Sequence, residues 1–155
     1  MKKALLILDV QEEFLGERLD YIEPLCQKYL DDHGNDYDAV ILTQWRHEQN
    51  RDRSTILLSH KKARVVDKVT YSALNDEVGS ILEDAAIEEV HIAGVDGELA
   101  VLATMFACLD AGYDVKVLER LISSFNNLNW EAMRIAKTAL GKQGVLQIAG
   151  GRVFL

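Results

Sequence analysis

The chain has 155 residues, which suits one domain with a sizeable buried core, and we expect residues 1–155 to form a single domain. The formal net charge of −8 opposes non-specific attraction to nucleic acid or to anionic membranes, so neither is expected as a partner. The apolar run at residues 4–8 is too short to span a bilayer or to act as a secretory signal, so we expect a cytoplasmic protein.

Strand-like and helix-like patterns alternate along the chain. Short apolar runs predict strands that are covered on both faces, and longer amphipathic stretches predict helices between them. This alternation, without a repeat or a linker, predicts an α/β fold with three αβα layers and a doubly wound parallel sheet. The expected strands cover residues 4–8, 38–43, 64–67, 89–93, 114–118 and 145–148, and the expected helices cover residues 12–32, 75–85, 98–111 and 130–140.

Single residues refine these boundaries. Pro24, the only proline, is expected to split the first helix into two segments. Asn129 is expected to cap the last long helix. Gly150 and Gly151 are expected to turn the last strand into a short hairpin with residues 152–154.

The segment from residue 44 to residue 62 is polar and basic, and it predicts a long loop with one turn of helix. Loops of this length in compact domains usually have a function or are mobile. Two interpretations stay open. The positive charges guide an anionic substrate into a pocket, or the segment is a solvated loop or a contact between subunits.

The ends of three predicted strands carry candidate catalytic residues. Asp9 follows the first strand, Lys68 follows the third, and a tight turn at residues 94–100 leads from the fourth strand into a helix. In a parallel sheet these ends meet at one edge, where open α/β folds bind their ligands. A carboxylate–ammonium pair beside a helix N-terminus can hold and move a proton while it stabilises a thiolate or an oxyanion. Ala100, the residue best placed on the turn, supplies no reactive group.

Three stretches resemble motifs of the isochorismatase-like cysteine hydrolases. LILDVQEEF at residues 6–14 resembles the opening motif of that family, and KVTYSAL at residues 68–74 resembles its lysine motif. GVDGELAVLAT at residues 94–104 is similar to its nucleophile motif. The resemblance implies a six-stranded parallel sheet in the order 3-2-1-4-5-6.

The resemblance also implies an Asp–Lys–Cys triad. In the family the cysteine attacks a carbonyl carbon, the aspartate, here Asp9, takes and returns the proton, and the lysine, here Lys68, holds both in register. Backbone N–H groups near Asp96 and Ala100 would form the oxyanion hole. The cis peptide bond that often precedes this turn in the family maps onto Val95–Asp96.

Two departures from the family pattern put catalysis in doubt. Ala100 stands where the family has cysteine, and Gly97 stands at a position that is commonly threonine. Cys108 lies eight residues further along the same predicted helix, about 12 Å away, and cannot replace the nucleophile. Cys26 has no motif around it, and we expect both cysteines to be buried, reduced thiols.

Two explanations of Ala100 stay open. A cysteine-to-alanine substitution is a standard way to inactivate such an enzyme for study, and the retained Asp9 and Lys68 favour this explanation, since an unused buried charge is costly. Gly97 favours the other, a natural pseudoenzyme, because an engineered inactivation would not need it. Under either explanation the chain should not perform covalent thiol catalysis.

The resemblance also bears on cofactors and on the pocket. Nicotinamidase-like members carry an Asp-x-His metal motif after the second strand, but Trp45 holds the aspartate position here and His47 stands alone. A single imidazole is a poor metal site, so no metal and no cofactor are expected. The residues expected to line the pocket are Gln11, Phe14, Trp45, His47 and Tyr71.

The sequence therefore predicts an isochorismatase-like hydrolase scaffold for a small amide-type (C–N) substrate, inactive as written. The alternative is a pseudoenzyme that serves as a small-molecule-binding or protein-interaction module. A nucleotide-binding module is a weak third candidate, because the turn at residues 94–100 has no glycine-rich phosphate fingerprint and no Walker lysine. The expected partners are a small molecule and, by the resemblance, further copies of the chain in a homo-oligomer.

Overall fold

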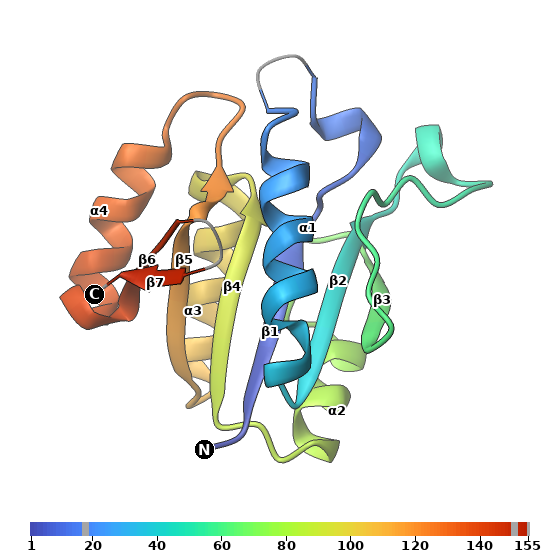
Figure 1. Cartoon of the computed structure of the whole chain (residues 1–155). Helices are drawn as coiled ribbons and strands as arrows, with labels where there is room; N and C mark the ends of the chain where they lie inside the picture. Colours follow the sequence, from blue (N-terminus) through green and yellow to red (C-terminus); the bar gives the residue numbers. More distant parts are fainter. Residues whose placement is uncertain (17–18, 150–151, 155) are drawn as a thin grey trace.

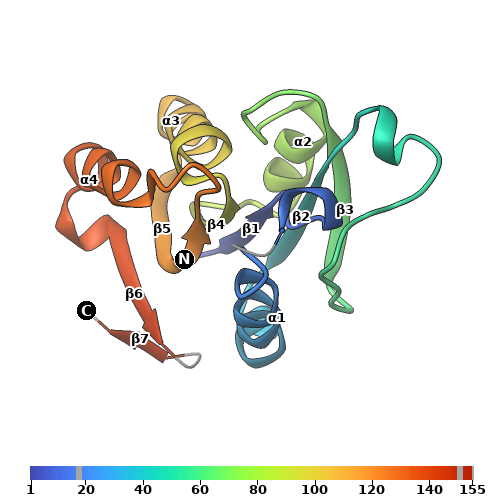
Figure 2. The same cartoon turned by 90° about the horizontal axis from the view of Figure 1, so that it is seen from above.

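A computed structural model shows a central sheet between two layers of helices (Figures 1 and 2). It describes residues 1–16, 19–149 and 152–154. Seen from above, α1 (Ile22–His33) covers one face of the sheet, while α2 (Asp76–Asp84), α3 (Leu102–Asp110) and α4 (Asn129–Leu140) cover the other. The three-layer αβα prediction is confirmed.

The sheet has the order β3-β2-β1-β4-β5-β6-β7. The first six strands run parallel, which confirms the order 3-2-1-4-5-6, and the added β7 pairs antiparallel with β6. The turn expected at Gly150 and Gly151 lies outside the described residues. The strands are β1 (Lys3–Leu8), β2 (Ala39–Trp45), β3 (Ala63–Lys68), β4 (Glu89–Val95), β5 (Asp114–Ser123), β6 (Val145–Ala149) and β7 (Arg152–Phe154).

Alternating side chains of the strands fill two separate cores. Leu5 and Ile7 of β1 pack in the cluster under α1, whereas Ala4, Leu6 and Leu8 pack in the cluster under the other three helices. Both faces of β1 are therefore buried, which explains why its sequence is apolar without alternation. β1 lies between β2 and β4, so the winding of the chain reverses beside it, at the switch point of the fold.

The prediction of a helix over residues 12–32 was wrong for the part before Ile22. Only Glu12–Phe14 form a 3₁₀ turn, and α1 begins at Ile22. The segment after β1 instead pairs with the 44–62 loop: Glu12 N donates to Thr55 O at 3.0 Å. Pro24 does not split the helix because it stands in the first turn, where its missing N–H has no intrahelical partner to lose.

Three further predictions can be compared with the structure, of which one is wrong and two are confirmed. Asn129 does not cap α4: it is the first residue of the helix, and its amide Nδ2 donates to Ile122 O at 3.1 Å, which ties α4 to β5. The loop after β2 does contain one helical turn, a 3₁₀ helix at Glu48–Asn50. Cys26 and Cys108 are both buried and unpaired, as expected.

Across the described parts of the chain, no helix combines the length and the apolar character needed to cross a bilayer.

Candidate functional site

Three strand ends meet at the upper edge of the sheet in Figure 1, beside the switch point. Asp9 directly follows β1, and Lys68 is the last residue of β3. Because β2 lies between these two strands, the lysine side chain reaches across the end of β2. Its Nζ lies 2.9 Å from Asp9 Oδ2, so the structure brings the two predicted residues together.

Both charged groups of this pair are buried and fully engaged. Asp9 is 4% exposed and Lys68 is 3% exposed. Lys68 Nζ also donates to the backbone oxygens of Thr70 at 2.7 Å and Tyr71 at 3.1 Å, so its three protons all have acceptors. Thr43 Oγ1 donates to the other Asp9 oxygen, Oδ1, at 2.9 Å.

Burial moves the pKa values of the pair toward each other. It raises the pKa of the Asp9 carboxyl above its ordinary value, although Lys68 and the hydrogen bond from Thr43 act against the rise. Burial likewise lowers the pKa of Lys68, against the pull of Asp9. The two groups therefore differ less in proton affinity than they would in water, and a proton can be exchanged at Asp9 at a lower cost.

The turn after β4 differs from its prediction in two ways. The strand does not stop at Gly94 but continues to Val95. The chain then passes through a cis Val95–Asp96 bond, as expected, and enters a π-helical turn at Gly97–Val101 before α3 begins. Turns of this type are frequent at functional sites.

At Gly94 the backbone of β4 leaves no room for a side chain against β1. Its φ is +112°, a region that favours glycine, and a Cβ at this position would lie 2.2 Å from Leu8 O. This close approach brings the end of β1, and with it Asp9, beside the start of the π-turn. Asp96 O accepts hydrogen bonds from the backbone N–H groups of Leu99 and Val101, which closes the turn.

A cavity of about 240 Å³ opens over these strand ends. It brings together Asp9, Asp96 and Ala100 with an aromatic wall, in which the Trp45 and Tyr71 rings lie 5.5 Å apart. Ala100 is itself buried. The complete lining consists of Asp9, Phe14, Trp45, Tyr71, Val95, Asp96, Leu99 and Ala100.

Two predicted wall residues do not line the cavity. Gln11 is fully buried and fastens the end of β2: its Oε1 accepts from Trp45 N at 2.6 Å and its Nε2 donates to Trp45 O at 3.1 Å. His47 lies behind the wall, stacked on Phe14 with ring centroids 5.8 Å apart. Leu99 is a wall residue that the sequence analysis missed, because nothing in its local pattern shows which way it points.

The residues near His47 do not fit a metal ion. Its Nδ1 accepts from Gln49 N at 3.3 Å, so Nε2 carries the proton that it donates to Glu13 Oε2, 2.7 Å away. Trp45, two residues before His47 in the chain, offers no ligand atom. Within the part of the chain that the structure describes, no three His, Cys, Asp or Glu side chains gather in a metal-binding arrangement.

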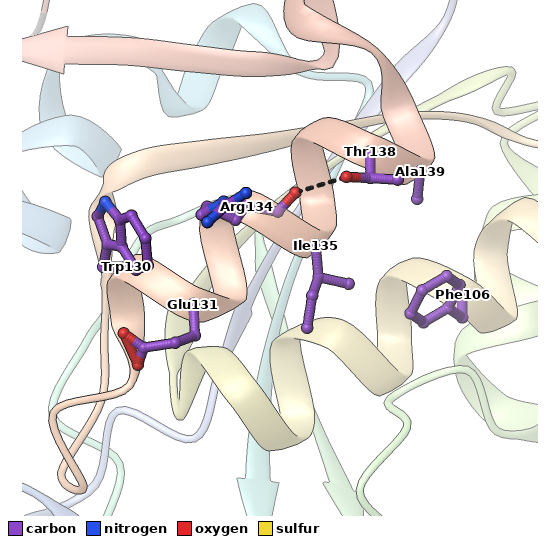
Figure 3. Close-up of a pocket in the computed structure, with 7 residues that line it drawn as sticks. All are labelled: Phe106, Trp130, Glu131, Arg134, Ile135, Thr138 and Ala139. Carbon is purple, nitrogen blue, oxygen red and sulfur yellow. Dashed lines mark hydrogen bonds between the residues drawn. The ribbon is translucent and has the colours of Figure 1, made fainter.

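A second hollow lies between α3 and α4, away from the strand ends (Figure 3). It measures about 480 Å³ and is mainly apolar, with Phe106, Trp130 and Ile135 among its lining residues. Trp130 is 67% exposed and so is not a core residue. The hollow contains no counterpart of the buried ion pair.

The fold and the site define a doubly wound α/β protein with a ligand cavity at its switch point. The chain matches the isochorismatase domain over residues 3–144 and belongs to the isochorismatase family. A comparison with curated proteins finds no significant match.

Solved structures share the fold over nearly the whole chain. A nicotinamidase from Bacillus subtilis is 20% identical, with a TM-score of 0.79 over 96% of this chain and 100% of that one. An isochorismatase-like hydrolase from Alkaliphilus metalliredigens is 18% identical, with a TM-score of 0.80 over 97% and 95%. A pyrazinamidase from Pyrococcus horikoshii, solved in complex with zinc, is 18% identical, with a TM-score of 0.79 over 96% and 99%.

Proposed function

We propose that this chain binds a small amide-type molecule at the switch-point cavity and does not hydrolyse it, because Ala100 occupies the position of the nucleophile. The observation that carries the proposal is the buried Asp9–Lys68 pair, which borders the same cavity as Ala100. A buried ion pair is costly to maintain, and its position beside a π-turn suits the transfer of a proton to and from a thiol.

The missing thiol would complete a simple reaction. Its sulfur would attack the carbonyl carbon of the amide while Asp9 takes the thiol proton. The C–N bond would then break, and the leaving amine would receive that proton from Asp9, which leaves the acyl group on the sulfur as a thioester. Asp9 would next take a proton from a water molecule as the water oxygen attacks the thioester carbonyl, and the thiol would leave with that proton and release the carboxylic acid. Lys68 would hold the carboxylate and the thiolate in place, and backbone N–H groups at Asp96 and Ala100 would face the oxyanion.

The surroundings of Gly97 support natural divergence over a laboratory substitution at position 100 alone. A Cβ at this position would lie 2.6 Å from Asn129 Oδ1 and 3.1 Å from Ile122 Cγ2. A side chain at position 97 would therefore displace the end of the Asn129 side chain at the start of α4 and crowd the Ile122 side chain of β5. We infer a natural pseudoenzyme, and we place it in the reducing cytoplasm, where its two unpaired cysteines would persist.

The test restores the nucleophile with Ala100→Cys and follows intact mass during incubation with a panel of small aromatic and aliphatic amides. We expect at least one amide to leave an acyl group on the protein. Asp9→Asn in the same background is the matched control and should abolish the adduct, because the thiol then loses its base. If no amide acylates the Ala100→Cys variant while it remains folded, the amide-hydrolase ancestry of the cavity loses its support.

A further inference from the structure

The charges that border the cavity do not balance. Asp9 and Asp96 contribute two carboxylates, and Lys68 contributes the ammonium that neutralises the first of them. Because all three Lys68 protons are already donated, this ammonium has none left for an anionic ligand.

Asp96 is the cavity carboxylate that has no counter-ion among the described residues. Its Oδ1 accepts the backbone N–H of Phe125 at 3.0 Å, and its Oδ2 has no partner within the described residues. Burial raises the pKa of Asp96, and the nearby Glu98 acts in the same direction, while the hydrogen bond from Phe125 N–H acts against the rise. Among the residues that the structure describes, no cation stabilises its charged form. A ligand that brings a positive charge would relieve this imbalance.

The other walls of the cavity also suit a cation. Phe14, Trp45 and Tyr71 present aromatic rings, whose faces attract positive charge and planar groups. Lys68 already shows this preference, since its Nζ lies 4.5 Å from the centroid of the Trp45 ring. Leu99 completes the apolar part of the wall.

Two arginines of the adjacent 44–62 loop pair with carboxylates outside the cavity. Arg46 Nε lies 3.0 Å from the Asp67 carboxylate, and Arg53 pairs with Glu12 at 2.9 Å. Neither arginine lines the cavity. The geometry therefore gives no support to the interpretation that this loop guides an anionic substrate.

We propose that the cavity selects a small planar organic cation, such as an amidine or a protonated heteroaromatic amine, with its charge against Asp96 and its ring against Phe14, Trp45 and Tyr71. This inference rests on the proposed function only in placing a ligand in the same cavity. The preference for positive charge comes from Asp96 and the aromatic wall, and it does not depend on Ala100.

The test compares benzamidine with benzamide, two probes of nearly the same shape that differ in charge. Binding is followed by the fluorescence of Trp45 in a Trp130→Phe background, since Trp130 is the other tryptophan and lies exposed in the hollow between α3 and α4. We expect benzamidine to bind about tenfold more tightly than benzamide, and the difference to shrink at high salt.

Asp96→Asn isolates the group responsible. The variant keeps an oxygen that can accept a hydrogen bond from the Phe125 N–H but loses the charge. Benzamidine and benzamide should therefore bind to it with about equal affinity. Glu131→Gln, an exposed carboxylate outside the cavity, is the matched control and should keep the full preference. Thermal unfolding verifies that both variants are folded.

Three outcomes would overturn the inference: benzamide binds as tightly as benzamidine, the preference survives Asp96→Asn, or neither probe binds. These outcomes test the charge preference of the cavity and do not decide the proposed function. Acylation of the Ala100→Cys variant without a preference for benzamidine leaves the proposed function standing and removes only the charge selectivity. A clear preference without acylation removes the amide chemistry and keeps the cation site.

Discussion

Lys68 is the residue on which the electrostatics of the site depend. It reaches from β3 to Asp9, holds the backbone of the following turn through Thr70 and Tyr71, and lies over the ring of Trp45. The sequence predicted its meeting with Asp9 because parallel strands place their carboxyl ends at one edge. Its bonds to the turn have no sequence signature, because they depend on the path of the backbone after β3.

Replacing Lys68 with methionine should destabilise the protein by about 3–5 kcal/mol at pH 7, since the buried Asp9 charge then has no partner. Without Lys68 the pKa of Asp9 rises further, and a protonated Asp9 carries no charge to compensate. The difference from wild type should therefore narrow as the pH falls through that raised pKa. Urea unfolding at several pH values measures it.

A double variant, Asp9→Asn with Lys68→Met, provides the control for this prediction. It removes both charges together, so it should be less destabilised at pH 7 than Lys68→Met alone. Equal losses in the single and the double variant, independent of pH, would contradict the view that Asp9 is charged and paired.

The close packing of β4 against β1 at Gly94 is the element-scale feature that shapes the site. A Cβ on Gly94 would enter the backbone of Leu8, so Gly94→Ala should cost at least about 3 kcal/mol. Gly112→Ala is the matched control: its φ is also positive, at +96°, but the space around it is open, and the cost should be about 1 kcal/mol. Thermal unfolding of both variants measures the contrast, and similar losses would contradict the close approach.

Sequence patterns predicted the elements better than their ends. Apolar runs located the six parallel strands, because burial on both faces leaves a clear signal. The same patterns missed the extension of β5 to Ser123 and the π-turn after Asp96, since pairing with neighbours decides both. Gln11 was expected in the cavity wall because it lies two residues after Asp9 in the sequence. Its two hydrogen bonds to the Trp45 backbone are tertiary contacts, which the sequence pattern does not show.

At the scale of the whole molecule, the hollow between α3 and α4 is the surface best suited to the expected homo-oligomer. Phe106, Trp130 and Ile135 are all exposed there (Figure 3). Glu131 and Arg134 lie on the same exposed face of α4, so a two-fold axis can bring each glutamate against the partner copy's arginine. We therefore expect two copies of the chain to pair through this hollow.

Ile135→Glu should convert that dimer to a monomer, because it places a charge in the apolar hollow. Light scattering coupled to size-exclusion chromatography measures the mass. Val65→Glu, at an exposed apolar position on β3, is the control and should remain dimeric. A monomeric wild-type protein, or a dimer that survives Ile135→Glu, would contradict this assignment.

The most direct test of the central claim, that only the nucleophile is missing from this site, is the pH dependence of alkylation of the Ala100→Cys variant. The native thiols give a silent background, because burial raises the pKa of both Cys26 and Cys108 to about 12. We predict a reactive thiol whose apparent pKa lies below the ordinary value of about 8.5, while Val65→Cys, exposed on β3 and outside the proposed dimer interface, keeps that ordinary value. A thiol at position 100 with an ordinary or raised pKa would contradict the claim.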